Sequence, residues 1–312
     1  MLGLLKKSAG PKGRIGVAFA GDQIALAVVH RDGGTVTLDR CELIPFNPKG
    51  GPEAVAATFR AADLPRLPIS TVLRPDDYQL AMIEAPDVPP AELRAAMRWR
   101  LKDAIDFRVE DAVIDVFDVP AQNRGGQGRM MYAVAARRTS VERHAAALVT
   151  LPGFDVVDVP ELCLRNLAAL LPAAASGVAL LHLGETMATI VLVRGSTFYF
   201  ARQMDLQATL RIASGTIPSG RLDAASVVLE LQRSLDYYER HFDQPPITRI
   251  SVSPTSTRSV ELAEDLSRET GLEVSTLELD SIMNCSLSLD AATQATCLLA
   301  VGAALRDEQR SL

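Results

Sequence analysis

One pattern of predicted strands occurs twice in this chain and constrains the fold more than any other feature. The second copy, GVALLHLGETMATIVLVRGSTFYFARQMDL at 177–206, contains three apolar or β-branched runs separated by turns with glycine: 178–183, 188–193 and 197–203. Residues 14–43 repeat this order about 160 positions earlier, a period too long for a solenoid. The repeat predicts two domains of one fold, although two unrelated β-meanders would also look alike.

The composition is that of an ordinary soluble globular protein. Of the 312 residues, 48% are hydrophobic and 22% charged, and the net charge of −6 argues against general nucleic-acid binding. No apolar run approaches the roughly 18–20 residues that cross a bilayer, and the N-terminus does not resemble a secretory leader. The four cysteines lie far apart without CxxC spacing. We therefore expect a cytoplasmic protein with reduced thiols, no metal, no nucleic-acid partner and no membrane span.

Hydrophobic periodicity predicts alternating helices and strands elsewhere. Helices are expected at 52–62, 91–105, 139–151, 161–171, 205–214, 222–242, 257–270 and 291–305. Strands are expected at 69–73, 78–84, 111–118, 130–136, 155–159, 249–252 and 273–277. Thr139 or Ser140 is expected to cap its helix, and Trp99 to pack on a neighbouring subdomain or to stay partly exposed. The Gly-rich loop at 124–129 opens no helix, which favours a hairpin tip over a phosphate site.

Four segments carry a resemblance to a known family: AMRWRLKDAIDFRVEDAVIDVFDV (96–119), MYAVAARR (131–138), GFDVVDVPELCLRNL (153–167) and LQRSLDYYE (231–239). With the two meanders, they resemble the type IV pilus assembly protein PilM and its counterpart MshI of mannose-sensitive haemagglutinin pili. These matches run in family order from about residue 14 to 305, so nearly the whole chain is covered.

The resemblance implies an α/β, actin-like (ribonuclease H-like) duplicated fold. A flexible N-terminus at 1–13 would precede a first domain at 14–172, with an inserted subdomain of the FtsA/PilM type at about 76–138. A second domain would span 173–308, with a smaller subdomain at about 205–244.

The resemblance also locates a nucleotide site, whose positions can be read one by one. Related ATPases carry aspartates, glycines, hydroxyl groups and often a lysine there, because Mg²⁺ needs hard oxygen ligands and phosphates need cations and free amides. At the matching positions this chain has Ala18, Ala20, Asp22 and Ala25, then His182, Gly184, Glu185 and Thr186, then Ser253 and Pro254. The metal-orienting acids and the lysine are missing, so we expect a pseudo-ATPase without cofactor.

Two alternatives to a fully inactive site remain open. Gly184, Glu185 and Thr186 could retain nucleotide binding. His182 either donates a hydrogen bond to a nucleotide there or lies at the end of a buried strand with its hydrogen bonds made within the protein. The competing function is an actin-like ATPase or small-molecule kinase with a diverged Mg-ATP site. The chain lacks GxSxG, GxxxxGK[ST] and HExxH motifs, so other common chemistries have no sequence support.

The resemblance implies a non-catalytic scaffold of a type IV pilus or related secretion machine, peripheral to the inner membrane through its partners. The expected partner is the cytoplasmic tail of a bitopic, PilN-like membrane protein, with the motor ATPase and other machine components beyond it and a homodimer possible. An apolar groove is expected to take this tail as an extended peptide. Its expected residues are Tyr78, Leu80, Met82, Leu93, Met97 and Trp99. An FtsA-like membrane filament is a third reading, and it would need a longer amphipathic terminus.

Overall fold

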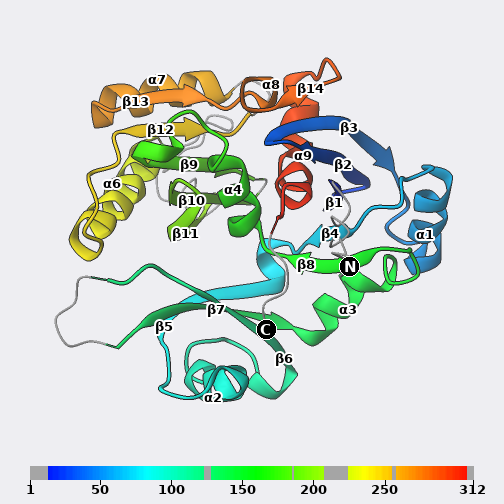
Figure 1. Cartoon of the computed structure of the whole chain (residues 1–312), viewed down its shortest axis with the longest axis horizontal. Helices are drawn as coiled ribbons and strands as arrows, with labels where there is room; N and C mark the ends of the chain where they lie inside the picture. The colour runs from blue at the N-terminus through cyan, green and yellow to red at the C-terminus, as the bar shows by residue number, and fades with distance from the viewer. Residues whose placement is uncertain (1–12, 123–127, 185, 207–223, 255–257, 308–312) are drawn as a thin grey trace, which may run out of the picture.

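The computed structural model describes residues 13–122, 128–184, 186–206, 224–254 and 258–307 (Figure 1). Two large sheets lie side by side, and a smaller sheet lies below them in this view. Some expectations fall wholly or partly outside the described residues, namely the flexible terminus expected at 1–13, of which only residue 13 is described and lies in a strand, the loop at 124–129 and the helix expected at 205–214. The proposed domain boundaries stay a prediction.

Both large sheets are built on the same strand order. The first is β14-β3-β2-β1-β4-β8, with strands Asn284–Cys285, Thr35–Pro45, Gln23–Asp32, Gly13–Ala20, Ile69–Val72 and Phe154–Asp158. The second is β11-β10-β9-β12-β13, with strands Thr197–Asp205, Met187–Arg194, Val178–Leu183, Arg249–Val252 and Glu273–Thr276. In each, an antiparallel meander is followed by two parallel strands. The duplication expected from the sequence is confirmed.

The helices follow the predicted order with differences at their ends. They are α1 (Gly51–Ala61), α2 (Pro90–Leu101), α3 (Arg138–Ala146), α4 (Pro160–Ala168), α6 (Ala224–His241), α7 (Arg258–Thr270), α8 (Leu279–Ile282) and α9 (Ala291–Ala304). The expected caps Thr139 and Ser140 are wrong, because α3 begins one residue earlier and has no side-chain cap at Arg137. Helix α2 ends at Leu101 rather than at 105, in turns around 102–107. Helix α8 and strand β14 were not expected.

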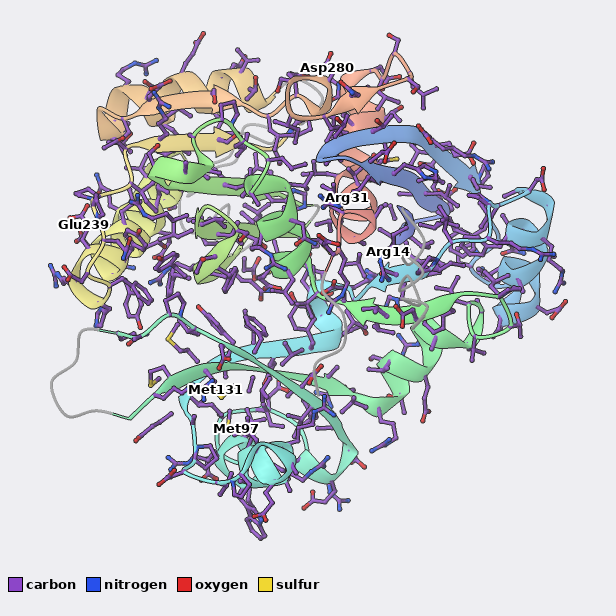
Figure 2. All side chains as sticks on the ribbon, in the orientation of Figure 1. Arg14, Arg31, Met97, Met131, Glu239 and Asp280 are labelled. Carbon is purple, nitrogen blue, oxygen red and sulfur yellow. The ribbon has the colours of Figure 1, made fainter. Side chains whose placement is uncertain are left out.

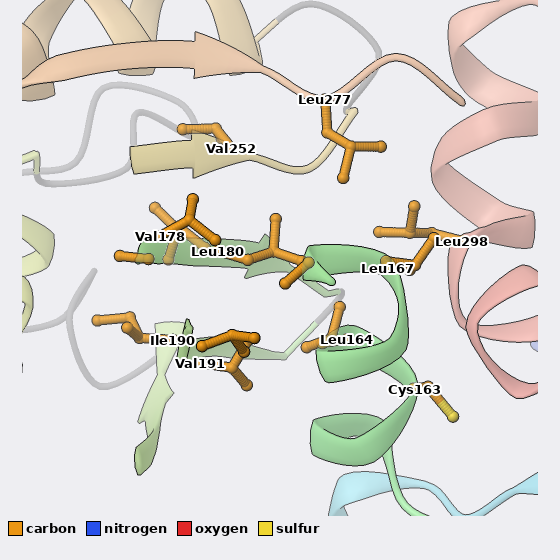
Figure 3. Packing of buried hydrophobic residues seen from close by; sticks show 14 of the residues in the cluster. Cys163, Leu164, Leu167, Val178, Leu180, Ile190, Val191, Val252, Leu277 and Leu298 are labelled. Carbon is orange, nitrogen blue, oxygen red and sulfur yellow. The ribbon is translucent and has the colours of Figure 1, made fainter. Parts of the chain in front are cut away.

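Helices α4 and α9 join the two large sheets into one core. Figure 3 shows Leu167 of α4 beside Leu298 of α9, with Leu164 facing the strands of the second sheet. One continuous hydrophobic cluster runs from Ala25 in the first sheet to Val191 in the second. The two repeats are therefore not separate cores, and burial of this shared surface stabilises their arrangement.

Two glycines allow α9 to approach its neighbours. A Cβ at Gly16 of β1 would lie 1.8 Å from the carbonyl oxygen of Ala300, and one at Gly302 would lie 2.5 Å from the carbonyl oxygen of Cys163 in α4. Both obstacles are backbone atoms, which cannot rotate away as a side chain can. The Nδ2 of Asn166 donates to the carbonyl of Gly302 at 2.9 Å and ties α4 to α9.

The third sheet is inserted into the first half of the chain. It has the order β5-β7-β6, with strands Tyr78–Glu84, Met130–Arg137 and Ala112–Asp118. One face packs on α2, and Figure 2 shows Met97 of the helix close to Met131 of the sheet. The other face meets β11 through Phe117, Tyr132 and Phe198, whose rings lie 5.2–5.6 Å apart between centroids. The Tyr132 hydroxyl also accepts a hydrogen bond from the amide of Ala201.

The close approach at Gly16 predicts a large cost for the smallest side chain. Gly16→Ala should lower the free energy of unfolding by at least about 3 kcal/mol, because the added methyl overlaps three backbone atoms of α9. Urea denaturation of the purified variant measures this change.

Gly21→Ala is the matched control in the adjacent turn. Gly21 has φ +58° and nothing within 4 Å of an added Cβ, so only the left-handed backbone penalty of about 1 kcal/mol applies. Equal losses in the two variants would contradict the role given to the contact between β1 and α9.

Candidate functional site

The first expected nucleotide position lies in the β1–β2 hairpin and is apolar. Ala18 and Ala25 are paired directly across the two strands, and both are buried in the main core cluster. Ala20 pairs with Gln23 at the turn, where Asp22 is exposed. Methyl groups in a packed core offer no ligand to Mg²⁺ and no cation to a phosphate.

The second and third positions are brought together at the ends of β9 and β12. Ser253 is fully buried, and its Oγ lies 3.2 Å from Nδ1 of His182 and accepts from the amide of Leu183 at 3.2 Å. The amide of Ser253 in turn donates to the carbonyl of Leu181 at 2.8 Å. Pro254 is buried beside it in the chain. These bonds tie the ends of β9 and β12 to each other.

His182 is held in its neutral form. Burial lowers the pKa of His182 to about 4, since the charged imidazolium loses hydration there. With Ser253 as its partner, this geometry favours the reading of a satisfied histidine at a strand end over that of a phosphate ligand. A neutral imidazole also adds no positive charge to attract an anion.

The glycine turn of the second meander is closed by its own chain. The amide of Gly184 donates to the carbonyl of Met187 at 2.9 Å, and the carbonyl of Thr186 accepts from Leu206 at 2.9 Å. Glu185 lies outside the described residues. Within the part of the chain that the structure describes, no group of three His, Cys, Asp or Glu side chains could hold a metal ion.

The residues expected to form the partner groove do not line one surface. Met97 is fully buried between α2 and its own sheet, and Trp99 is 78% exposed on the outer side, which contradicts packing on a neighbouring subdomain. Tyr78 and Leu80 line a small pocket of about 430 Å³, and Met82 instead contacts the Tyr237 hydroxyl through its sulfur. Leu93 lines a different, larger cavity. The apolar stripe of α2 packs against its own sheet, and the expected groove stays a prediction.

That larger cavity is a cleft of about 1340 Å³ between the first sheet and the inserted sheet. Strand β8 at the edge of the first sheet and strand β6 at the edge of the inserted sheet both line it. Its apolar lining comes from several elements and includes Val113, Phe117, Val134, Leu162 and Phe198. Sequence analysis missed this cleft, because its walls come from segments up to about two hundred positions apart; the alternating pattern of β6 was the only local signal.

The charged groups in the cleft are mostly paired within the chain. Their ion pairs are Arg94 with Asp115, Arg129 with Asp118, Arg306 with Asp158 and, at the rim, Arg14 with Asp155. Paired charges leave little net field in the cleft. Its recognition chemistry is therefore that of apolar side chains and backbone groups.

A buried polar network fixes the inserted sheet to both large domains. Glu161 of α4 is fully buried and accepts from the Tyr78 hydroxyl at 2.6 Å and from Nε2 of Gln203 at 2.7 Å. Burial raises the pKa of Glu161, and the two hydrogen bonds oppose that shift. The network joins β5, α4 and β11, so it sets how the inserted sheet stands over the cleft.

Known structures resemble this chain in fold. A solved structure described as the PilM-PilN type IV pilus biogenesis complex aligns with 95% of this chain and 98% of its own, at 20% sequence identity and a TM-score of 0.68. A Bacteroides thetaiotaomicron protein with an actin-like ATPase fold and unknown function aligns with 95% of this chain and 99% of its own, at 9% identity and a TM-score of 0.51. No protein-family model and no curated protein match the sequence. The likenesses confirm the expected actin-like α/β fold.

The environment of His182 predicts a pH-dependent stability. Its folded-state pKa of about 4 lies below the ordinary 6.5, so the unfolded chain takes up the proton first as the pH falls from 6.5 towards 4. The wild type should lose about 1–2 kcal/mol more unfolding free energy between pH 7 and pH 5 than His182→Asn does. Urea denaturation at both pH values measures the difference.

An NMR titration of the His182 ring supplies a direct check on the wild type. We expect a midpoint near pH 4 in the folded protein. A midpoint near 6.5, together with equal pH dependence in the two proteins, would show that the ring is hydrated and free to charge.

Proposed function

We propose that this chain is a non-catalytic scaffold of a type IV pilus or related secretion machine. In this proposal it binds the cytoplasmic tail of a bitopic, PilN-like inner-membrane protein. The observation that carries it is the apolar cleft between β8 and the inserted sheet, in a fold similar to that of the PilM-PilN complex. The cleft offers the shape and chemistry that an extended peptide requires.

The proposed binding site differs from the groove expected from the sequence. Leu93 is the one expected groove residue that lines the cleft. The other walls come from both faces of the inserted sheet around β6, with Val113 and Phe117 on one face and Val116 and Met131 on the other, and from strand β8 of the first sheet. A cleft of about 1340 Å³ is larger than a typical drug-sized site and suits several peptide residues.

The absence of catalysis is part of the proposal. It is supported by buried alanines at 18 and 25, by a neutral His182 and by Ser253 closing the ends of β9 and β12. A Mg-ATP site needs carboxylates and open backbone at these positions. On this view no cofactor is bound, and the fold serves as a framework for the cleft.

We further propose a cytoplasmic location at the inner membrane, reached through the partner. We also propose that the chain contacts a motor ATPase and works in an MshI-type machine. It could do so as a homodimer. In the described part of the chain, no helix is long and apolar enough to cross a membrane.

Mg-ATP should leave the thermal stability of this protein unchanged. A ligand that binds only the folded state raises the free energy of unfolding by about 2.7 kcal/mol when its concentration is one hundred times its dissociation constant. Even weak nucleotide binding would therefore be detectable at millimolar Mg-ATP. We expect no shift in melting temperature by differential scanning fluorimetry. A shift that grows with Mg-ATP concentration and is absent with Mg²⁺ alone would favour the ATPase or kinase alternative.

A charge in the cleft should weaken partner binding. Val113 lines the cleft on β6, and Val113→Asp would place a carboxylate among apolar side chains. Isothermal titration with a synthetic peptide of the PilN-like tail encoded in the same genome should show at least about tenfold weaker binding, near 1.4 kcal/mol.

Val149→Asp is the matched control, since Val149 is 65% exposed and does not line the cleft. Its affinity should equal that of the wild type. Unchanged affinity in Val113→Asp, with the fold intact by circular dichroism, would place the peptide elsewhere.

A further inference from the structure

Two of the four cysteines face each other where α9 packs on the first sheet. Gly16 of β1 pairs with Ala27 of β2, and Ala27 pairs with Cys41 of β3, so these three residues lie in one row on one face of the sheet. Helix α9 covers that face, because a Cβ at Gly16 would lie 1.8 Å from the carbonyl oxygen of Ala300. The Cys41 side chain therefore points towards α9.

Cys297 lies on the matching face of α9. It precedes Ala300 by three positions, a spacing that places both side chains on one side of the helix. Its thiol donates to the carbonyl oxygen of Glu42, the residue after Cys41 in β3, with 3.7 Å between sulfur and oxygen. The Cys41 sulfur is a second acceptor for the same S–H group. The two buried thiols are thus hydrogen-bonded across the joint between helix and sheet.

The two thiols differ in exposure and in acidity. Cys41 is 6% exposed, whereas Cys297 is fully buried. The hydrogen bond from Cys297 lowers the pKa of Cys41, although burial and the Glu42 carboxylate act against it. The same bond, together with burial, raises the pKa of Cys297. Because the thiolate is the reactive form of cysteine, Cys41 is the thiol that a small oxidant meets first.

The other two cysteines are placed differently. Cys285 of β14 pairs with Leu38, and the rise of about 3.3 Å per residue along β3 puts it farther from Cys41 than the roughly 7 Å between Cα atoms that a disulfide allows. Cys163 of α4 packs beside Gly302, on another side of α9. Burial raises the pKa of both thiols. They are therefore matched controls for the hydrogen-bonded pair.

We propose that Cys41 and Cys297 are a modification site, at which a hydroperoxide converts the two thiols into a disulfide that links β3 to α9. The bond is reversible, because an external dithiol reduces it by exchange. The close approach of α9 at Gly16 makes the short Cα separation of a disulfide attainable. Neither cysteine lines the cleft of the proposed function, so the site is independent of the peptide.

The chemistry proceeds in two steps. The Cys41 thiolate attacks one oxygen of hydrogen peroxide, so that an S–O bond forms, the O–O bond breaks and the leaving hydroxide takes up the proton that Cys41 released. The Cys297 sulfur then attacks the resulting sulfenic acid. An S–S bond forms, the S–O bond breaks, and hydroxide leaves with the Cys297 proton as a second water. The two sulfurs together lose two electrons, and the peroxide gains them.

A disulfide here would affect the whole architecture. It would close a loop from β3 to α9 that includes most of the chain, and a long closed loop restricts the unfolded state strongly. Since α9 joins the two large sheets in one hydrophobic cluster, the bond would also make this joint covalent. Oxidation should therefore make the folded protein more resistant to heat.

Mass spectrometry of the oxidised protein identifies the site. The full chain is reduced with dithiothreitol, freed of reductant, treated with hydrogen peroxide and digested without reduction. We expect one cross-linked peptide pair that joins Cys41 to Cys297 and disappears on renewed reduction. The melting temperature of the oxidised protein should rise by at least about 5 °C.

Single serine variants test the assignment. Cys41→Ser and Cys297→Ser should show neither the cross-link nor the rise in melting temperature, whereas Cys163→Ser and Cys285→Ser should keep both. Circular dichroism reports whether each variant folds, and the peptide map of the wild type decides the question if a variant does not.

The peptide map also shows what would overturn the proposal. A cross-link between other cysteines, or oxidation of Cys41 to sulfinic acid without a cross-link, overturns the pairing. So does a folded wild type whose thiols all stay reduced at a peroxide concentration that oxidises them in urea. A link between Cys41 and Cys297 that dithiothreitol reverses supports the site, whatever the peptide titrations of the cleft show.

Discussion

The architecture depends on the contact of α9 with β1 on one side and with α4 on the other. Gly16 and Gly302 make this contact possible, because any side chain there would overlap backbone atoms of the neighbouring element. The result is one hydrophobic cluster that runs through both repeats. Two similar halves that could have been separate domains with separate interiors are thereby fixed relative to each other.

The same packing involves the positions where a nucleotide site was expected from the sequence. Ala18 and Ala25 contribute to the cluster, and the Ser253 hydroxyl bonds the ends of two neighbouring strands. Carboxylates in place of these alanines would be buried without partners, at a cost of several kcal/mol unless a metal offset it. In the proposed function, this site has gained packing and lost the groups that bind metal and phosphate.

The inserted sheet adds to this framework the surface on which the proposed function depends. The network of Tyr78, Glu161 and Gln203 and the aromatic contacts of Tyr132 hold the sheet to both domains, and a deep cleft remains beside β8. Because the cleft charges pair within the chain, the proposed recognition depends on shape, apolar contact and backbone groups. These properties suit an extended peptide better than a charged small molecule.

The sequence alone determined the strands and their duplication, since alternation and β-branched runs are local properties. The strands predicted at 78–84, 178–183 and 249–252 have those limits in the structure. Helix ends were less accurate, and the two residues of β14 are a strand only because they pair with β3. Local signals do not contain such contacts.

Some features of the candidate site were also predictable from the sequence, and others depended on tertiary packing. The missing acids could be read from the sequence, because a residue type at a motif position is local information. The cleft could not, because its walls are brought together by packing, and because the stripe of α2 that suggested a groove is covered by its own sheet. Which backbone groups of β6 and β8 are hydrogen-bonded depends on strand pairing, and only the tertiary structure decided it.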